Sequence, residues 1–288
     1  MTLTLISRPT SASLRSGWSR ARALVLICLL VAGLTPVRAQ DSLALVEYLP
    51  GEKIFPRFTA DGREHQMSLS AITKNREWIG AVGASVPVIQ VNPRGTTLQA
   101  SVAATIFNRL VKTPGHLTVY TIDYKVDLPF DLRISRLAIR TGLGHISCHF
   151  ADDALELYGE RSIQHVNDYI ILGVAYDVPG LQGYLYARAN YSYGTQPVPD
   201  RPWLLQFGGD LGNIPLFQDV AVYGAFDIKV KEETGWGSTQ SYQAGVKLFA
   251  HGSRQLRLAY TLRLGYDERG QFYLDRDTLQ LISVFLDL

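Results

Sequence analysis

The feature that most constrains this chain is a two-residue period of apolar side chains. From about residue 66 onward the period of two dominates and the helical period of 3.6 is absent. The clearest case is the segment 256–266, in which six Leu or Tyr residues alternate with Arg, Ala, Thr and Gly. A strand places all six on one face, whereas a helix would scatter them around its circumference. This part of the chain is therefore predicted to be all-β.

About twelve segments alternate in this way, and most of them have ten or more residues. They are 66–72, 78–91, 96–107, 117–128, 132–150, 163–178, 181–193, 203–212, 218–230, 239–250, 254–266 and 277–288. Strands of soluble proteins have about five or six residues, whereas a tilted strand that crosses a bilayer needs about nine to eleven. The lengths favour a closed membrane barrel, which satisfies every backbone polar group in lipid. A soluble β-barrel or sandwich in the periplasm is the alternative.

The connections between these segments alternate between long and short. The long ones are 108–116, 151–162, 194–202, 231–238 and 267–276, and the short ones are 92–95, 129–131, 179–180, 213–217 and 251–253. Outer-membrane barrels have short periplasmic turns and longer external loops. The final segment also alternates up to an apolar last residue, as the terminal strands of such barrels do. We predict an antiparallel outer-membrane β-barrel of about twelve strands over residues 66–288.

The first 39 residues resemble a signal peptide and do not belong to the fold. A positive region precedes a short apolar run, 23–34, and Val37-Arg38-Ala39 suits signal peptidase, so cleavage is expected after Ala39. The run has about a dozen residues, too few to span a bilayer as a helix. Residues 40–65 have little periodicity and are predicted to be an irregular segment by which the chain enters the barrel. The protein is expected in the outer membrane of a Gram-negative cell.

Removal of the signal peptide changes the charge and the cysteine content. Its five arginines leave with it, so the mature chain has a net charge of about −3, and no nucleic-acid partner is expected. Cys148 becomes the only cysteine, which excludes an intrachain disulfide. The expected partners are the lipid bilayer, lipopolysaccharide as a further candidate, and the barrel-assembly machinery, which would bind the C-terminal strand.

One group of residues has the composition of a catalytic site. His145, Ser147 and His149 occupy alternate positions near the outer end of segment 132–150, so in a strand they share a face. A serine hydroxyl becomes a nucleophile beside a base, usually histidine, which a carboxylate orients. The catalytic hypothesis is His145, Ser147 and Asp153. The nearby carboxylates are Asp152, Asp153, Glu156 and Asp168.

The same group is not expected to bind a metal. His145 and His149 are about 13 Å apart along a strand, too far for one ion without a bend, and the remaining histidines lack ligand spacing. Neither a metal nor a cofactor is predicted.

The direction in which these side chains face has two interpretations. The apolar residues of 137–143 are odd-numbered, as on a face that contacts lipid. If the alternation continues unchanged, His145 and Ser147 also face lipid. A bulge at Gly142 or Gly144 would instead turn them into a polar lumen. The lumen is preferred, because polar groups that face lipid cost free energy and need a purpose.

Two stretches resemble a bacterial family of outer-membrane-barrel-like proteins known only as a domain of unknown function. Residues 54–64 are similar to its motif of Phe-Pro followed by Ala-Asp-x-Arg-Glu, and residues 144–153 to its His-x-Ser-Ser-His-Leu-Gly-Asp-Glu segment. Gly62, Cys148, Ala151 and Asp153 depart from the pattern. The resemblance implies the barrel over most of the mature chain and lends no mechanism.

A second, local resemblance bears on the activity. His145-x-Ser147 is similar to the catalytic segments of the outer-membrane phospholipase A and lipid A deacylase families, which hydrolyse lipid esters. The match covers two residues. The sequence predicts a narrow, plugged barrel of structural or small-solute role, with a membrane-embedded lipid esterase that uses His145 and Ser147 as the alternative. Whether the chain is an enzyme stays open.

Overall fold

The computed structural model describes residues 45–75, 77–113, 115–251 and 254–287. The predicted signal peptide and its cleavage site lie outside these residues.

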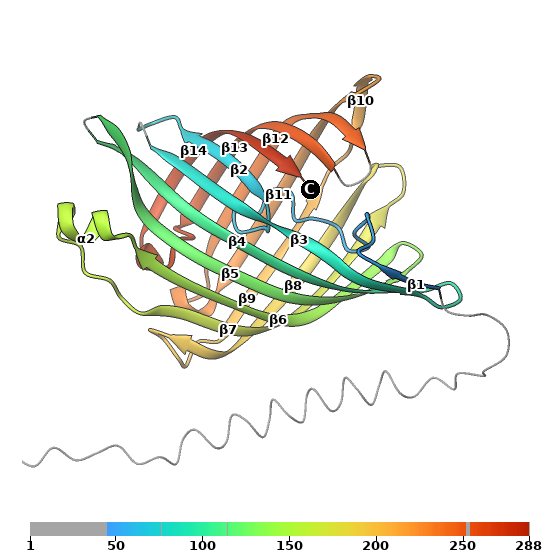
Figure 1. Cartoon of the computed structure of the whole chain (residues 1–288), viewed down its shortest axis with the longest axis horizontal. Coiled ribbons are helices and arrows are strands. Elements are labelled where there is room, and N and C mark those ends of the chain that lie inside the picture. The colour runs from blue at the N-terminus through green and yellow to red at the C-terminus, as the bar shows by residue number, and fades with distance from the viewer. Residues whose placement is uncertain (1–44, 76, 114, 252–253, 288) are drawn as a thin grey trace, which may run out of the picture. The chain divides into compact units, whose positions relative to one another are not determined.

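Twelve of the described strands close an antiparallel barrel (Figure 1). They are β2 (Met67–Ile72), β3 (Trp78–Asn92), β4 (Thr97–Thr113), β5 (His116–Ile134), β6 (Leu137–Phe150), β7 (His165–Val178), β8 (Gly183–Gln196), β9 (Trp203–Asp210), β11 (Val220–Lys231), β12 (Gly237–His251), β13 (Arg254–Tyr266) and β14 (Arg276–Asp287). Each pairs with its neighbours along the chain, and β14 pairs with β2 to close the ring. The predicted all-β barrel of about twelve strands is confirmed.

Short elements lie beside the barrel strands. Two further strands extend the sheet, β1 (Leu45–Tyr48) on β3 and β10 (Ile214–Phe217) on β11. The connections hold the helix α2 (Asp152–Tyr158) and the 3-10 helices η1 (Glu232–Thr234) and η2 (Gly270–Phe272). In the part of the chain that is described, no helix is long and apolar enough to cross a membrane.

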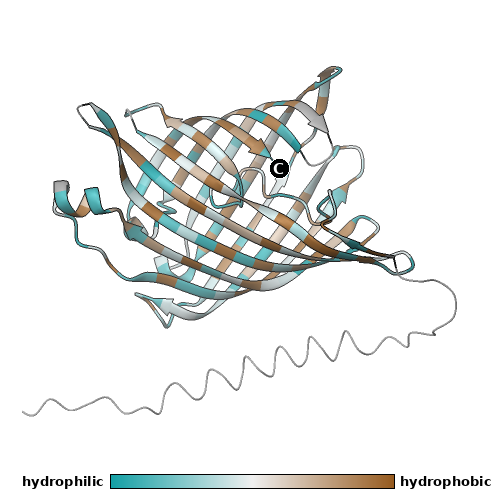
Figure 2. Cartoon of the chain, in the orientation of Figure 1, coloured by the Kyte–Doolittle hydropathy of each residue, from teal (hydrophilic) through white to brown (hydrophobic). Residues whose placement is uncertain are grey.

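The two faces of the wall differ as the alternation requires. On β13, Leu258 and Tyr260 are 41% and 45% exposed, whereas Arg257 before them and Thr261 after them are 0% and 2% exposed. Figure 2 shows the same alternation of hydrophobic and hydrophilic residues along the other strands. Apolar side chains therefore face outward and polar ones inward, the arrangement of a barrel with lipid outside, and the reverse of a soluble barrel.

Three predicted connections are wrong. The connection predicted to be short at 213–217 runs over residues 211–219 and contains β10. Residues 129–131 lie inside β5, and the turn that follows is at residues 135–136, where Ser135 has a φ of 53°, as tight hairpin turns require. The pairing of β5 with β4 skips from Phe130 to Asp127, so the missing N–H of Pro129 interrupts the ladder without ending the strand. The predicted long connection 108–116 is also short, because β4 and β5 stay paired up to Thr113 and His116.

Residues 49–66, between β1 and β2, have their central part inside the barrel. Phe55 and Phe58 are 2% and 1% exposed, and the Phe58 ring stacks on Tyr186 of β8 at 3.8 Å between centroids. The Arg140 guanidinium of β6 lies 4.1 Å from the Phe55 centroid. The aromatic residues thus fix this part of the segment against one side of the inner wall.

Polar contacts hold the same segment to other strands. Thr59 Oγ1 donates to Asp210 Oδ2 of β9 at 2.9 Å, and His65 Nε2 lies 2.9 Å from Asp127 Oδ2 of β5. Asp61 accepts a hydrogen bond of 2.9 Å from Gln206 and forms an ion pair with Lys229 of β11. Because these partners are spread over several strands, the segment crosses the lumen rather than lying along one wall.

Candidate functional site

His145 and Ser147 lie on the outer face of the barrel wall. β6 pairs with β5 and with β7 without any register shift over residues 137–148. The odd-numbered phase therefore continues: Leu137 and Leu143 are 39% and 45% exposed, and the His145 side chain is 45% exposed. The preferred interpretation, a bulge that turns the triplet into the lumen, is wrong. Gly142 and Gly144 instead occupy inward positions, where a Cβ would meet β5 or Tyr169.

His145 is paired with a carboxylate on the neighbouring strand. Its Nδ1 lies 2.7 Å from Oδ1 of Asp168, the residue directly opposite it in the register of β6 with β7. Residues directly opposite in an antiparallel pair point to the same side of the sheet, so both side chains face outward. A carboxylate only accepts, so Nδ1 carries the proton and Nε2 is left as the basic nitrogen.

The position of Asp168 depends on a glycine of β8. Gly194 is opposite Asp168, and a Cβ there would lie 3.0 Å from the carboxylate oxygen Oδ2. The register between β7 and β8 shifts immediately after Asp168. Because glycine at position 194 has no Cβ, the carboxylate of Asp168 has space beside β8.

Ser147 follows His145 by two residues on the same face. Its half-buried side chain lies between Tyr124 of β5 and Val166 of β7, its partners in the register. Residues two apart on a strand are separated by about 6.6 Å, a distance that the side chains of His and Ser can close by rotating toward each other. The third member of the triplet, His149, is exposed, and its ring centroid is 6.0 Å from that of Tyr124.

Asp153, the predicted orienting carboxylate, lies elsewhere. It is exposed in the first turn of α2, which follows the last residue of β6, Phe150. The carboxylate in contact with His145 is Asp168, which is fifteen positions farther along the chain but opposite in the sheet. Sequence proximity favoured Asp153. Only the strand register could have selected Asp168.

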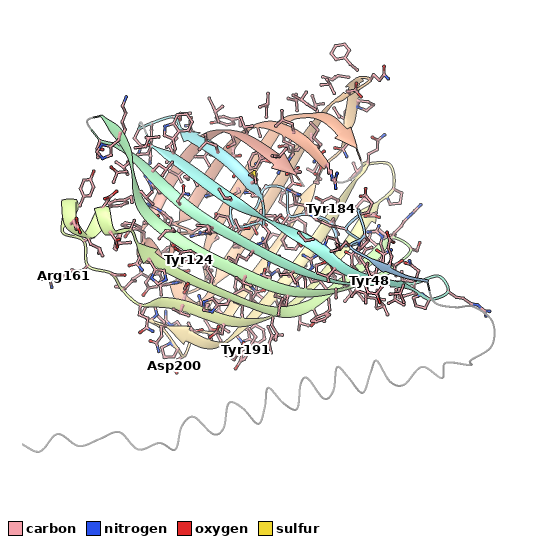
Figure 3. The ribbon with its side chains drawn as sticks, viewed as in Figure 1. Tyr48, Tyr124, Arg161, Tyr184, Tyr191 and Asp200 are labelled. Atoms are coloured by element: carbon pink, nitrogen blue, oxygen red, sulfur yellow. The ribbon has the colours of Figure 1, made fainter. Side chains whose placement is uncertain are left out.

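The surroundings of this group are apolar and aromatic. Val126, opposite His145, is 42% exposed, and Leu143 beside it is also outward. Near the same end, Tyr191 of β8, labelled in Figure 3, is exposed on the outward face. The ring of Trp203 on β9, also exposed, lies 5.0 Å from it between centroids. Aromatic girdles mark the bilayer interfaces of such barrels. The polar group therefore interrupts an apolar surface close to its aromatic rim.

Within the described part of the chain, no group of three or more His, Cys, Asp or Glu residues has the geometry of a metal site. The chemistry that His145, Ser147 and Asp168 can perform is proton transfer and nucleophilic attack.

Solved structures similar to this one are outer-membrane barrels. A crystal structure of the outer membrane phospholipase dimer of Salmonella typhi with bound calcium matches 77% of this chain and 90% of its own, at 12% identity and a TM-score of 0.52. The outer membrane phospholipase A of Escherichia coli matches 77% and 95%, at 12% identity and a TM-score of 0.53. At this identity the likeness concerns the fold. No curated protein matches the sequence.

The family comparison covers nearly all of the described barrel. The family described as "Protein of unknown function (DUF1207)" matches residues 34–284, which include both motifs that carry the resemblance noted from the sequence. The chain belongs to this family.

Proposed function

We propose that the chain is an outer-membrane lipid esterase with Ser147 as nucleophile, His145 as general base and Asp168 as the residue that orients the imidazole. The observation that carries this proposal is the 2.7 Å pair between His145 and Asp168 on the outward face, with Ser147 on the same face two residues away. A polar group on a lipid-facing surface costs free energy and usually serves a purpose.

The reaction follows from these roles. Ser147 Oγ attacks the carbonyl carbon of a lipid ester while His145 Nε2 takes the hydroxyl proton. Asp168 stabilises the imidazolium through Nδ1–H, and the tetrahedral intermediate collapses when the imidazolium gives its proton to the leaving alcohol. Water, activated by the same imidazole, then cleaves the acyl-serine and releases a fatty acid. Atoms and charge balance without a cofactor.

The surroundings favour a membrane lipid as the substrate. Ester groups of lipids lie between the acyl chains and the head groups, and the site lies where the apolar wall approaches its aromatic rim. A substrate in the bilayer could therefore reach Ser147 laterally. The structural likeness to barrels named as outer membrane phospholipases supports this substrate class.

Release of fatty acid from lipid vesicles tests the proposal. The refolded barrel is reconstituted with phospholipid or with lipid A, and free fatty acid is measured for the wild type and for Ser147→Ala. Wild-type protein is expected to release fatty acid from one of the two, and Ser147→Ala to lose at least about 10³-fold of that rate. An unchanged rate in Ser147→Ala would refute the role of this serine.

The interior supports a second proposal, that the barrel is closed to diffusion. The segment 49–66 crosses the lumen, and the charges around it are largely paired, among them Arg257 with Asp287 at 2.7 Å and Arg140 with Asp131 at 2.7 Å. A lumen filled by paired charges leaves little room for solute. This property is compatible with the esterase, because the proposed site lies on the outer face.

Conductance of single barrels in a planar bilayer tests the closed lumen. We expect no stepwise current from the wild type at neutral pH. Regular steps comparable to those of a general porin would contradict the proposal, and esterase activity in the same preparation would be judged separately.

A further inference from the structure

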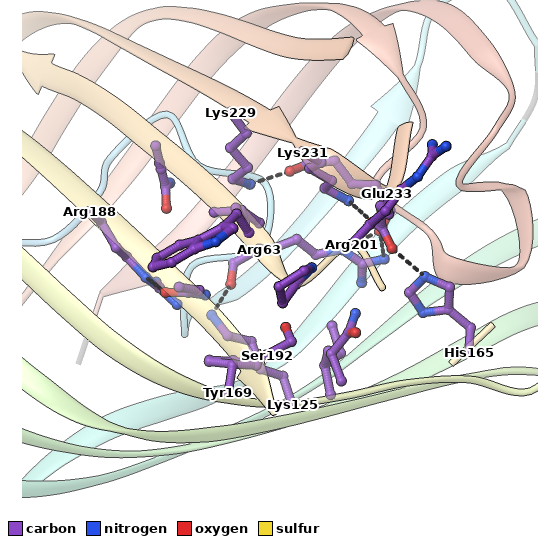
Figure 4. Close-up of a pocket in the computed structure, with 18 of the residues that line it drawn as sticks. Arg63, Lys125, His165, Tyr169, Arg188, Ser192, Arg201, Lys229, Lys231 and Glu233 are labelled. Carbon is purple, nitrogen blue, oxygen red and sulfur yellow. Dashed lines mark hydrogen bonds and ion pairs between the residues drawn. The ribbon is translucent and has the colours of Figure 1, made fainter. Parts of the chain in front are cut away.

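A cavity of about 100 Å³ lies inside the barrel, near the end at which α2 follows β6. It reaches from Arg201, which is exposed in the connection between β8 and β9, to the half-buried Arg63 of the segment that crosses the lumen (Figure 4). The buried Asp61 of the same segment also lines it. Its walls come from β5, β6, β7, β8, β9 and β11. The proposed esterase residues lie on the opposite face of this wall, so the cavity is a separate feature.

The residues that line the cavity carry an excess of positive charge. Three carboxylates line it, those of Asp61, Glu233 and Glu268. Twice as many cationic side chains line it: Arg63, Lys125, Arg188, Arg201, Lys229 and Lys231. Water-excluding walls strengthen the field of such a group of charges.

The three carboxylates are already occupied. Lys229 forms ion pairs with both Asp61 and Glu268, and Glu233 lies 3.3 Å from Lys231 and 3.4 Å from His165. Together these contacts outweigh the burial of Glu233, which alone would raise its pKa, and hold that pKa at about 2. Glu233 therefore remains ionised, and all three carboxylates are engaged by Lys229 or Lys231 and not by the remaining cations.

Two arginines keep no carboxylate partner among the described residues. Arg188 donates through Nε to Asn190 Oδ1 at 2.7 Å and its guanidinium lies 6.0 Å from the Tyr169 ring centroid, but no acid is within ion-pair distance. Arg201 likewise forms no ion pair there. A partly buried guanidinium without an anion costs free energy. Binding of an anion in this cavity would therefore be favourable.

The neutral residues beside Arg188 are hydrogen-bond donors. Asn190 and Ser192 follow it at alternate positions on the inner face of β8, and Asn167 of β7 also lines the cavity. Arg188, Asn190 and Ser192 lie on β8 and Asn167 on the adjacent β7, and a phosphate with four oxygens can accept from more of these donors than a carboxylate with two. The size of the cavity suits a small group.

We propose that this cavity binds a phosphate group, held by Arg188 with the help of Asn190 and Ser192, while Arg201 attracts it at the outer opening. The phosphate is inorganic phosphate or the phosphate of a lipid head group, which present the same chemistry.

Calorimetric titration of the refolded barrel in a non-ionic detergent tests this site. Sodium phosphate, glycerol phosphate and sodium chloride are titrated at equal ionic strength into the wild type, Arg188→Gln and Arg254→Gln. Arg254 is an exposed cation at the other end of the barrel and serves as the matched control. Retention of the heat-modifiable band on gels reports that each variant is folded.

We expect saturable heat with a phosphate and none with chloride, and at least tenfold weaker binding in Arg188→Gln with unchanged binding in Arg254→Gln. Binding of inorganic phosphate would identify a free anion as the ligand, and binding of glycerol phosphate alone would identify a head group. The absence of saturable heat with both, or equal weakening in the two variants, would overturn the proposal.

Discussion

At the scale of single residues, two carboxylates can be compared as the partner of His145: Asp153, which is nearer in the sequence, and Asp168, which is opposite it in the strand register. Asp168→Asn removes the negative charge that stabilises the imidazolium and permits the wrong tautomer, so kcat should fall about 10²-fold or more. Asp153→Asn, in the exposed first turn of α2, should leave kcat unchanged. Initial rates of fatty-acid release from the same vesicles compare the two, and a larger loss in Asp153→Asn would contradict the assignment.

Two members of the proposed site could be selected from the sequence, whereas the third could only be named as one of four nearby carboxylates. His145 and Ser147 stand at alternate positions of one strand, so their shared face follows from the period alone. Asp168 becomes the partner of His145 through the register of β6 with β7. That register is set across a connection that contains a helix, and the alternation of one sequence does not determine it. The outward direction was also missed, because an expected bulge is absent.

At the scale of elements, the segment 49–66 is the part of the fold that alternation could not reveal. Its sequence has little periodicity, because its contacts are made one by one with different strands. Phe55 and Phe58, in the first motif shared with the family, are among the most buried side chains described. The motif thus stands where the chain packs inside the barrel.

Removal of one of these rings should destabilise the barrel. Phe58→Ala loses the ring that stacks on Tyr186 and leaves a cavity, so the free energy of unfolding should fall by about 3–5 kcal/mol. Phe217→Ala, at a ring that is 75% exposed, is the matched control and should change it little. Urea unfolding followed by tryptophan fluorescence in detergent measures both. Equal stability of the two variants would mean that the inner segment contributes little to the fold.

At the scale of the whole molecule, the barrel was predictable because closure leaves so few solutions. Long alternating strands, with no apolar run long enough for a spanning helix beyond residue 66, require a closed sheet in lipid. Connections that mostly alternate in length favour short turns at one end of the barrel and longer loops at the other. The exceptions, at Pro129, near Thr113 and at residues 211–219, change the connections without changing the number of barrel strands.

The proposed esterase site and the proposed phosphate site lie on opposite faces of the barrel wall. The outer face carries His145, Ser147 and Asp168 amid apolar side chains, and the inner face carries the phosphate cavity around Arg188. A lipid esterase on the outer face needs no open pore, so a filled lumen and catalysis are compatible.

The most direct test of the central claim is covalent labelling of the protein in outer-membrane vesicles with a long-chain alkyl fluorophosphonate, followed by peptide mass spectrometry. Activated serines displace fluoride from this reagent and retain the phosphonyl group. The adduct is expected on Ser147 in the wild type and absent in His145→Ala, whose serine has lost its base. An unmodified Ser147 in the wild type, or equal labelling in His145→Ala, would contradict the account.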